Sequence, residues 1–227
     1  MQVVETPHPP GALVLISGEL ARYALCLQHV SRLAVPNRSM EIWRTGVLVA
    51  ENLNRAFDSV METHAEWVWL MGDDHTFPED IVLKLLDRQV DVVATLCLNR
   101  VPPMDTFILS AELGRMKRLG EMPTEGLYKL GPGETCGDAG LLIRRNVLEA
   151  LERPFYNVLR SGSFKAEDQS FTRKIQDAGF PVHVDMDNHI GHLTPVAVEP
   201  IVKDGQWHVR LSAGARHIVD VQQRSRA

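Results

Sequence analysis

Short runs of apolar residues alternate, in the first part of the chain, with longer segments in which apolar residues recur every three or four places. Short apolar runs of this kind are typical of strands buried on both faces of a parallel sheet. The longer segments have the spacing of amphipathic helices. The predicted strands are 11–17, 40–45, 66–71 and 90–98, and the predicted helices are 18–33, 47–64 and 78–89.

This alternation of strands and helices predicts an α/β fold with a mostly parallel sheet and helices on both of its faces. Ligands of such sheets bind beyond the carboxyl ends of the strands. Asp73, Asp74 and His75 come directly after the strand at 66–71. We therefore expect these three side chains at the end of the sheet where a ligand binds.

The second half of the chain is less regular. We expect loops at 99–107 and 130–140, a short strand that runs into a helix at 141–154, a helix at 166–179, a strand at 180–186 and a polar turn at 187–193. The tail contains one possible strand, "QWHVRLS", and a frayed end, "VQQRSRA". No internal repeat or linker is visible. The pattern predicts a single domain over residues 1–227, with its core at about 12–193 and a C-terminal extension at 194–227.

Composition and charge limit the kinds of partner and the cellular compartment that we expect for the protein. The formal net charge is −5, so no global basic field attracts nucleic acid, and we expect no nucleic-acid partner. The three cysteines form no CxxC pair, which favours a reducing compartment. The N-terminus does not resemble a signal peptide, and no uncharged apolar run reaches about 18 residues. We expect a cytoplasmic protein without a transmembrane segment, and the oligomeric state stays open.

Three stretches carry candidate chemistry. The adjacent carboxylates of Asp73 and Asp74 suit a hard divalent cation, Mg²⁺ or Mn²⁺, that bridges phosphates, or else they cap the helix that begins near Pro78. His192, which follows a late strand, is a candidate imidazole ligand. The nearby His189 competes for this role, whereas a third histidine at 183 lies inside the predicted strand and is structural.

The third stretch is "KAEDQSF", in which Glu167 and Asp168 begin a helix. Acidic residues in the first turn stabilise a helix through its dipole. A carboxylate at this place also suits a base that removes a proton from an acceptor hydroxyl. The residues alone leave both interpretations open.

Taken in order, these segments resemble one family. The segments are an early strand, an acidic cluster followed by "FPED", a glycine-rich segment with "GLLIRR", an "ED" pair at a helix start, and a late histidine. Their order is similar to that of the GT-A fold glycosyltransferases of the family 2 type. The resemblance covers about residues 12–193. It implies a Rossmann-like sheet flanked by helices, a nucleotide-sugar donor, and a hydroxyl-bearing acceptor such as a saccharide.

The resemblance also implies roles for single residues. The acidic cluster resembles the DxD motif in one of two alignments: Gly72 to Asp74, or Asp73-x-His75, which is the DxH variant. In either alignment the metal is held on this turn, with Asp74 as the first choice of ligand and His75 and Asp73 behind it, and His192 completes the site.

Further roles follow from the same resemblance. Asp168 is the implied catalytic base of an inverting enzyme, and Glu167 is implied to hold the acceptor. The implied donor-pocket residues are Ser17, Glu19, Arg22, Arg44, Asn52, Asp73 and Asp138.

The implied activity is a metal-dependent transfer of a sugar from a nucleotide diphosphate to a hydroxyl group. A nucleotidyltransferase is an alternative, but "ISGELARY" has too little glycine for the phosphate loop that follows the first strand of such enzymes. A catalytically silent module that binds nucleotide sugars or carbohydrates is a second alternative. A metal-dependent phosphohydrolase is weaker, because no histidine-rich cluster accompanies the acids. The donor, the acceptor and the stereochemical outcome stay open.

Overall fold

The computed structural model describes residues 1–17, 24–46, 48–100, 102–157, 167–213 and 216–222. For residues 167, 168, 207, 213, 216–218 and 220–222 it describes the backbone alone. Glu19 and Arg22, two of the expected pocket residues, lie outside the described residues.

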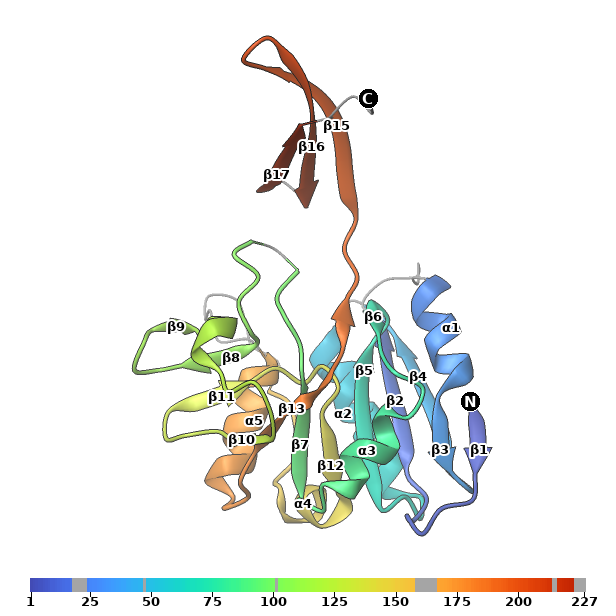
Figure 1. Ribbon diagram of the computed structural model, residues 1–227. Helices are drawn as coiled ribbons and strands as arrows, with labels where there is room; N and C mark the ends of the chain where they lie inside the picture. The colour runs from blue at the N-terminus through green and yellow to red at the C-terminus, as the bar shows by residue number, and fades with distance from the viewer. Residues whose placement is uncertain (18–23, 47, 101, 158–166, 214–215, 223–227) are drawn as a thin grey trace.

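A seven-stranded sheet forms the centre of the molecule (Figure 1). Its spatial order is β10 (Leu127–Lys129), β13 (His183–His189), β7 (Val92–Leu96), β12 (Leu142–Arg144), β5 (Trp67–Gly72), β2 (Ala12–Ser17) and β4 (Met40–Thr45). Most residues of β2, β5 and β7 are buried, because both faces of the sheet are covered.

The sheet is mostly parallel, as the sequence pattern predicted, but it is mixed because β12 and β10 run the other way. β2 is parallel to β4 and β5, and β13 is parallel to β7. β12 lies between β5 and β7 and is antiparallel to both, so β5 and β7 point the same way. β10 is antiparallel to β13 at the edge. A short buried apolar run has the same composition in either direction, and the sequence pattern therefore did not reveal the reversed strand.

Helices cover both faces of the sheet and close two apolar layers. The helices are α1 (Ala24–Arg32), α2 (Val49–Met61), α3 (Ile81–Asp87), α4 (Arg145–Ala150) and α5 (Glu167–Asp177). One layer joins α2, α4 and α5 to sheet residues such as Val14 and Leu70. The other layer joins α1 and α3 to Leu15 and Trp69, which alternate with the first pair along the same strands. This three-layer arrangement agrees with the predicted α/β fold.

The chain reverses its direction of travel across the sheet between β2 and β5. It leaves β2 for β4 on one side and then returns to β5 on the other side of β2. A crevice opens at such a switch point, beyond the carboxyl ends of the two strands, and ligands of α/β proteins bind there. Ser17 ends β2, and Gly72 ends β5 directly before the acidic cluster.

Several short strands were not expected. β1 (Gln2–Val4) pairs with β3 (Ala34–Pro36), and β8 (Ile108–Ser110) lies between β9 (Arg115–Met116) and β11 (Glu134–Cys136).

The segment 187–193 also differs from the expected polar turn. β13 continues to His189, and β14 (Gly191–His192) pairs with β6 (His75–Thr76). This small pairing is the element that brings His192 to the acidic cluster.

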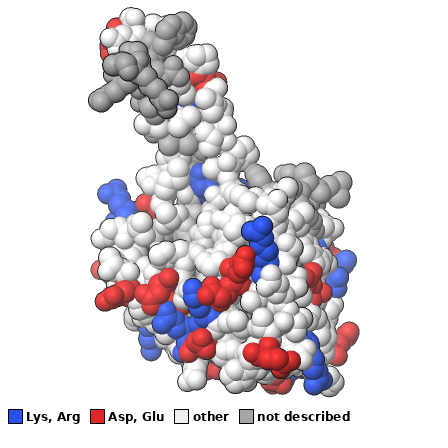
Figure 2. Space-filling model, turned by 45° about the vertical axis from the view of Figure 1, so that its right-hand side comes forward, with Lys and Arg blue, Asp and Glu red and all other residues white. Residues whose placement is uncertain are grey.

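The C-terminal extension has more structure than the sequence pattern predicted. β15 (Val196–Lys203), β16 (Gln206–Ala213) and β17 (Arg216–Gln222) form an antiparallel sheet of their own. Figures 1 and 2 show this sheet rising away from the body, to which β14 connects it. On the face of the body in Figure 2, basic and acidic side chains are interspersed. Within the described residues, no helix is long and apolar enough to cross a bilayer.

Candidate metal centre and donor pocket

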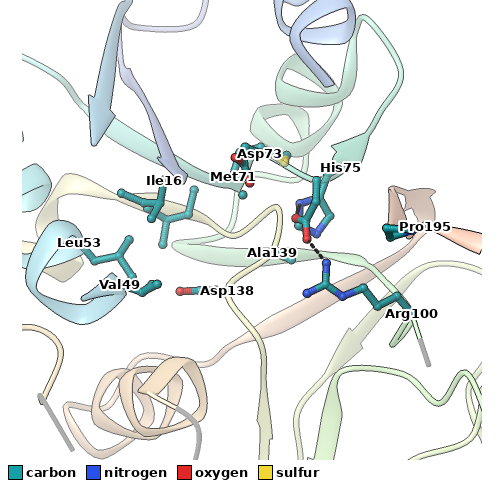
Figure 3. Close-up of a pocket in the computed structure, with 13 residues that line it drawn as sticks. Ile16, Val49, Leu53, Met71, Asp73, His75, Arg100, Asp138, Ala139 and Pro195 are labelled. Carbon is teal, nitrogen blue, oxygen red and sulfur yellow. Dashed lines mark hydrogen bonds and ion pairs between the residues drawn. The ribbon is translucent and has the colours of Figure 1, made fainter. Parts of the chain in front are cut away.

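A pocket of about 610 Å³ lies at the switch point between β2 and β5 (Figure 3). Apolar side chains form one side of it, and charged side chains from the acidic cluster and from Arg100 form the other. The pocket is lined by Ile16, Val49, Leu53, Leu70, Met71, Gly72, Asp73, Asp74, His75, Arg100, Asp138, Ala139 and Pro195.

Asp74 is the centre of the charged side. Its Oδ2 atom accepts a hydrogen bond from Arg100 Nη1 at 2.6 Å and lies 3.2 Å from His192 Nε2. Its Oδ1 atom lies 3.1 Å from His75 Nδ1. Burial would by itself raise the pKa of Asp74, but the close contacts of its carboxylate with His192 and His75 outweigh it and hold this pKa well below its usual range. Asp74 therefore keeps its negative charge at a lower pH than an ordinary aspartate does.

His192 is held in an orientation that suits a metal ligand. A backbone carbonyl only accepts hydrogen bonds, so His192 Nδ1 is the donor in its 3.1 Å bond to Leu98 O. A proton on Nδ1 leaves the lone pair of Nε2 for a cation, and carbonyl partners of this kind orient histidine ligands in metal sites. Nε2 is also the atom that faces Asp74.

His75 is buried without a hydrogen-bond partner. It is 5% exposed, and neither of its ring nitrogens makes a hydrogen bond within the described part of the chain. Its ring stacks on that of His192, with a centroid separation of 4.7 Å and an interplanar angle of 17°. A buried imidazole that lacks partners is costly unless something else satisfies it. A divalent cation between Asp74, His75 and His192 fits these donors.

Cys97 and Arg100 are residues of this site that sequence reasoning missed. One donor atom from each of His75, Cys97 and His192 lies within 4.8 Å of the other two. Burial, together with the charge of Asp74, raises the pKa of Cys97 to about 12. Both missed residues follow the buried part of β7, in the stretch "TLCLNR". Because ligands bind at the carboxyl ends of parallel strands, the position of these residues after a predicted strand was a signal that could have identified them.

Ser17 and Asp138, two of the expected pocket residues, lie near the switch point. Ser17, fully buried, donates a 2.5 Å hydrogen bond from Oγ to Asp73 Oδ2 and so links the end of β2 to the end of β5. Asp138 lines the pocket from the loop between β11 and β12. Its Oδ2 accepts a 2.9 Å hydrogen bond from the hydroxyl of Tyr156, another residue that the sequence analysis did not select.

Arg44 and Asn52 lie elsewhere and do not line the pocket. Arg44, on β4, donates to Ser59 Oγ of α2 at 2.8 Å. Asn52, on α2, donates from Nδ2 to Gly46 O at 3.1 Å. Both side chains therefore fasten α2 and the segment before it to the β4 edge.

The remaining predicted site residues lie on α5 and β13. Glu167 and Asp168 are the first two residues of α5, and their side chains lie outside the described part of the chain. His189, the competitor of His192, makes a 2.6 Å contact through Nε2 with Met186 O and does not line the pocket. His183 lies in β13 with Nδ1 3.4 Å from Val92 O.

Comparisons with known proteins were made for the sequence and for the fold. No protein-family model matches the sequence, and no curated protein matches it either. The fold is similar to that of A197 from STIV, with a TM-score of 0.57 and 14% identity, over 95% of this chain and 100% of that chain. It is also similar to GalNAc-T7, with a TM-score of 0.51 and 8% identity, over 88% of this chain and 45% of that chain.

GalNAc-T7 is a glycosyltransferase, and the matched structure contains UDP, GalNAc and Mn²⁺. At these identities the likeness concerns the fold alone. The chain therefore has a glycosyltransferase-like fold, as the family resemblance implied. The protein has in addition a group of side chains that can hold a metal ion.

Proposed function

We propose that this protein is a metal-dependent glycosyltransferase that moves a sugar from a nucleotide-diphosphate donor to an acceptor hydroxyl. One observation carries the proposal. Asp74 and His75, after the end of β5, line a pocket on a glycosyltransferase-like fold, and His192 of β14 contacts Asp74 from behind the pocket wall. An acid, an imidazole from the same turn and a second imidazole from a distant strand are the donors that the resemblance implies for the metal.

Asp74, His75 and His192 would hold a divalent cation, Mn²⁺ or Mg²⁺, on the charged side of the pocket. Such a cation supplies positive charge beside the diphosphate, where negative charge develops as the glycosidic bond breaks. His192 is already oriented for this role by Leu98 O. Arg100, whose side chain is 44% exposed, pairs with Asp74 at the rim of the same site and would face the diphosphate.

The rest of the pocket suits the other parts of the donor. Its volume lies within the range of about 300–1,000 Å³ that is usual for small-molecule sites. Ile16, Val49 and Leu53 offer an apolar wall for the flat face of a base or for the sugar ring. Asp138, held by Tyr156, would accept a hydrogen bond from a sugar hydroxyl.

The base is assigned to Asp168, with Glu167 at the acceptor. Both residues begin α5, whose buried Thr172 bonds to the backbone of Cys136 just before Asp138 in the chain. The middle of α5, about one turn after Asp168, is thereby tied to the segment that leads to the pocket residue Asp138. A carboxylate that takes the hydroxyl proton from the side opposite the leaving group would give inversion at the anomeric carbon.

Donor hydrolysis tests the proposal, because a transferase without its acceptor usually hydrolyses some donor. Nucleotide sugars are incubated with the full chain in Mn²⁺ and, separately, in EDTA. We expect release of the nucleoside diphosphate with Mn²⁺ and none with EDTA. Binding without any release in either condition would favour the silent binding module, and release of pyrophosphate from nucleoside triphosphates would favour the nucleotidyltransferase.

A further inference from the structure

The two histidines of the candidate metal centre have a second potential partner on the side of β7. Cys97 follows β7 directly and is 4% exposed. Its thiol has a weak contact of 3.7 Å with Leu98 O. One donor atom each from His75, Cys97 and His192 falls within a mutual distance of 4.8 Å. Two imidazoles and a thiol thus converge from β6, the end of β7, and β14.

His75 provides independent support that this cluster binds a ligand. Nε2 of His75 is buried and has no hydrogen-bond partner among the described residues, although Cys97 and His192 are close neighbours, whereas Nδ1 lies 3.1 Å from Asp74 Oδ1. A structural histidine in a core normally donates at least one N–H to a nearby acceptor. The arrangement is explained if the free nitrogen of His75 is a ligand that binds a cation.

The spacing fits a small cation with sulfur and nitrogen ligands. Zinc binds sulfur at about 2.3 Å and imidazole nitrogen at about 2.0–2.1 Å, so tetrahedral ligand atoms lie about 3.5 Å apart. The separations of up to 4.8 Å shorten to this value if each side chain moves inward by less than about 1 Å. Rotation about side-chain bonds provides such a shift without a change in the strands.

We propose that Cys97 is a ligand of this centre together with His75 and His192, and that the centre selects a thiophilic divalent cation, with Zn²⁺ the best fit. On binding, the thiol releases its proton to solvent and the thiolate occupies one coordination position. Mg²⁺ prefers oxygen donors and is disfavoured by such a set. The fourth position faces Asp74 and the pocket, where Asp74 or a phosphate oxygen takes it, as in catalytic zinc sites.

This inference rests on the proposed function only in that both place a cation beside Asp74. It changes the ion expected there from Mn²⁺ or Mg²⁺ to one that accepts sulfur. It is tested by metal binding alone, so a failure to transfer sugar would leave it standing, and its own failure would leave a cation held by Asp74, His75 and His192 in place.

Cobalt titration of the full chain provides the test, because Co²⁺ occupies zinc sites and a thiolate ligand gives a charge-transfer band in the near ultraviolet. We expect the band in the wild-type protein, its displacement by one equivalent of Zn²⁺, and no displacement by a large excess of Mg²⁺. Cys97→Ser should lose the band and at least about tenfold in Zn²⁺ affinity.

Cys136→Ser is the matched control, since Cys136 is also buried but lies on β11. It should keep the band. Cobalt binding by the wild-type protein without the band would overturn the proposal, as would equal zinc affinities of the Cys97→Ser and wild-type proteins. The wild-type spectrum decides the question even if Cys97→Ser fails to fold.

Discussion

Asp74 is the residue on which the positive groups of the site converge. Arg100, His75 and His192 all contact its carboxylate, and no other acid of the described chain contacts these three groups together. The contacts keep its pKa low although the side chain is partly buried. A carboxylate with these partners remains charged, so it is available to a divalent cation as an oxygen ligand.

The first prediction concerns the charge of this residue. Asp74→Asn keeps the size of the side chain but removes the negative charge, and we expect donor hydrolysis to fall on the order of 100-fold or more. The folded state should persist because Asp74 lies at a strand end outside the core. Initial rates and a thermal unfolding curve measure the two effects.

Asp80→Asn is the control for that experiment, because the side chain of Asp80 is half exposed and its only ion pair among the described residues is with Lys84 on α3. It should behave like the wild-type protein. Full activity of Asp74→Asn would remove Asp74 from the metal site.

A second residue, Asp168, has a predicted role that is separable from binding. Asp168→Asn should lower kcat by roughly 10²–10⁴-fold, the usual contribution of a general base, and leave donor affinity unchanged. Steady-state kinetics and calorimetric donor binding distinguish these effects. Asp177→Asn, at the other end of α5, should change neither quantity. A loss of donor binding equal to the loss of kcat would contradict the base role.

At the scale of elements, the glycine-rich loop before β12 controls how the pocket residues approach the sheet. Gly140 has a φ of +67°, and a Cβ atom there would lie 2.1 Å from Thr95 Oγ1 of β7. Its amide donates to Leu70 O, and its carbonyl accepts from the amide of Thr95. The close packing of this loop on the sheet holds Asp138 at the pocket.

The third prediction follows from this packing. Gly140→Ala should lower the free energy of unfolding by about 2–5 kcal/mol, from left-handed backbone strain of about 1–2 kcal/mol and overpacking of about 1–3 kcal/mol. Chemical denaturation measures the change. Gly126→Ala is the matched control, since Gly126 has a φ of +81° with open space around it, so it should show the strain alone. Equal losses for the two variants would contradict the packing argument.

The fourth prediction concerns the contact between α3 and β13. Arg88, just after α3, donates from Nε and Nη2 to the fully buried Asp185 of β13 at 2.7 and 2.8 Å. Because Arg88 itself stays partly exposed, we expect Asp185→Ala to cost about 2–3 kcal/mol of unfolding free energy, less than a fully buried pair.

Denaturant titration measures this loss. Asp187→Ala removes the other, exposed partner of Arg88 and should cost under about 1 kcal/mol. A loss for Asp185→Ala no larger than that for Asp187→Ala would show that the buried pair does not fasten β13.

The sequence anticipated elements better than their arrangement. The strand at 40–45 and the helices at 47–64 and 78–89 follow from local periodicity, because each covers a single face of the core. The reversal of β12 and the pairing of β14 with β6 depend on contacts between distant segments, which local periodicity does not encode.

The candidate site shows the same division. The acids and His75 were visible because they follow a strand that local pattern predicts, and His192 was selected through a family resemblance. Cys97 and Arg100 looked like an apolar strand end and a loop residue until the fold placed them beside Asp74. Arg44 and Asn52 were selected from the same resemblance. Their side chains instead form hydrogen bonds with α2 and with the segment before it, away from the pocket.

In the molecule as a whole, three distant segments of the chain form the one site on which the proposed function depends. The turn after β5 supplies Asp74 and His75, the end of β7 supplies Cys97 and Arg100, and β14 supplies His192. All three segments lie at the carboxyl ends of parallel strands, on one edge of the sheet. A glycosyltransferase-like fold with a cation at this edge would bind a nucleoside diphosphate through that cation.

Calorimetric titration of the full chain with nucleoside diphosphates, in a divalent cation and then in EDTA, tests this most directly. We run it with Mn²⁺ and with Zn²⁺, for the wild-type protein and for Asp74→Asn. We expect that at least one nucleoside diphosphate binds only when a cation is present and that Asp74→Asn abolishes the binding. Binding of equal affinity in EDTA, or no binding of any nucleoside diphosphate with either cation, would contradict it.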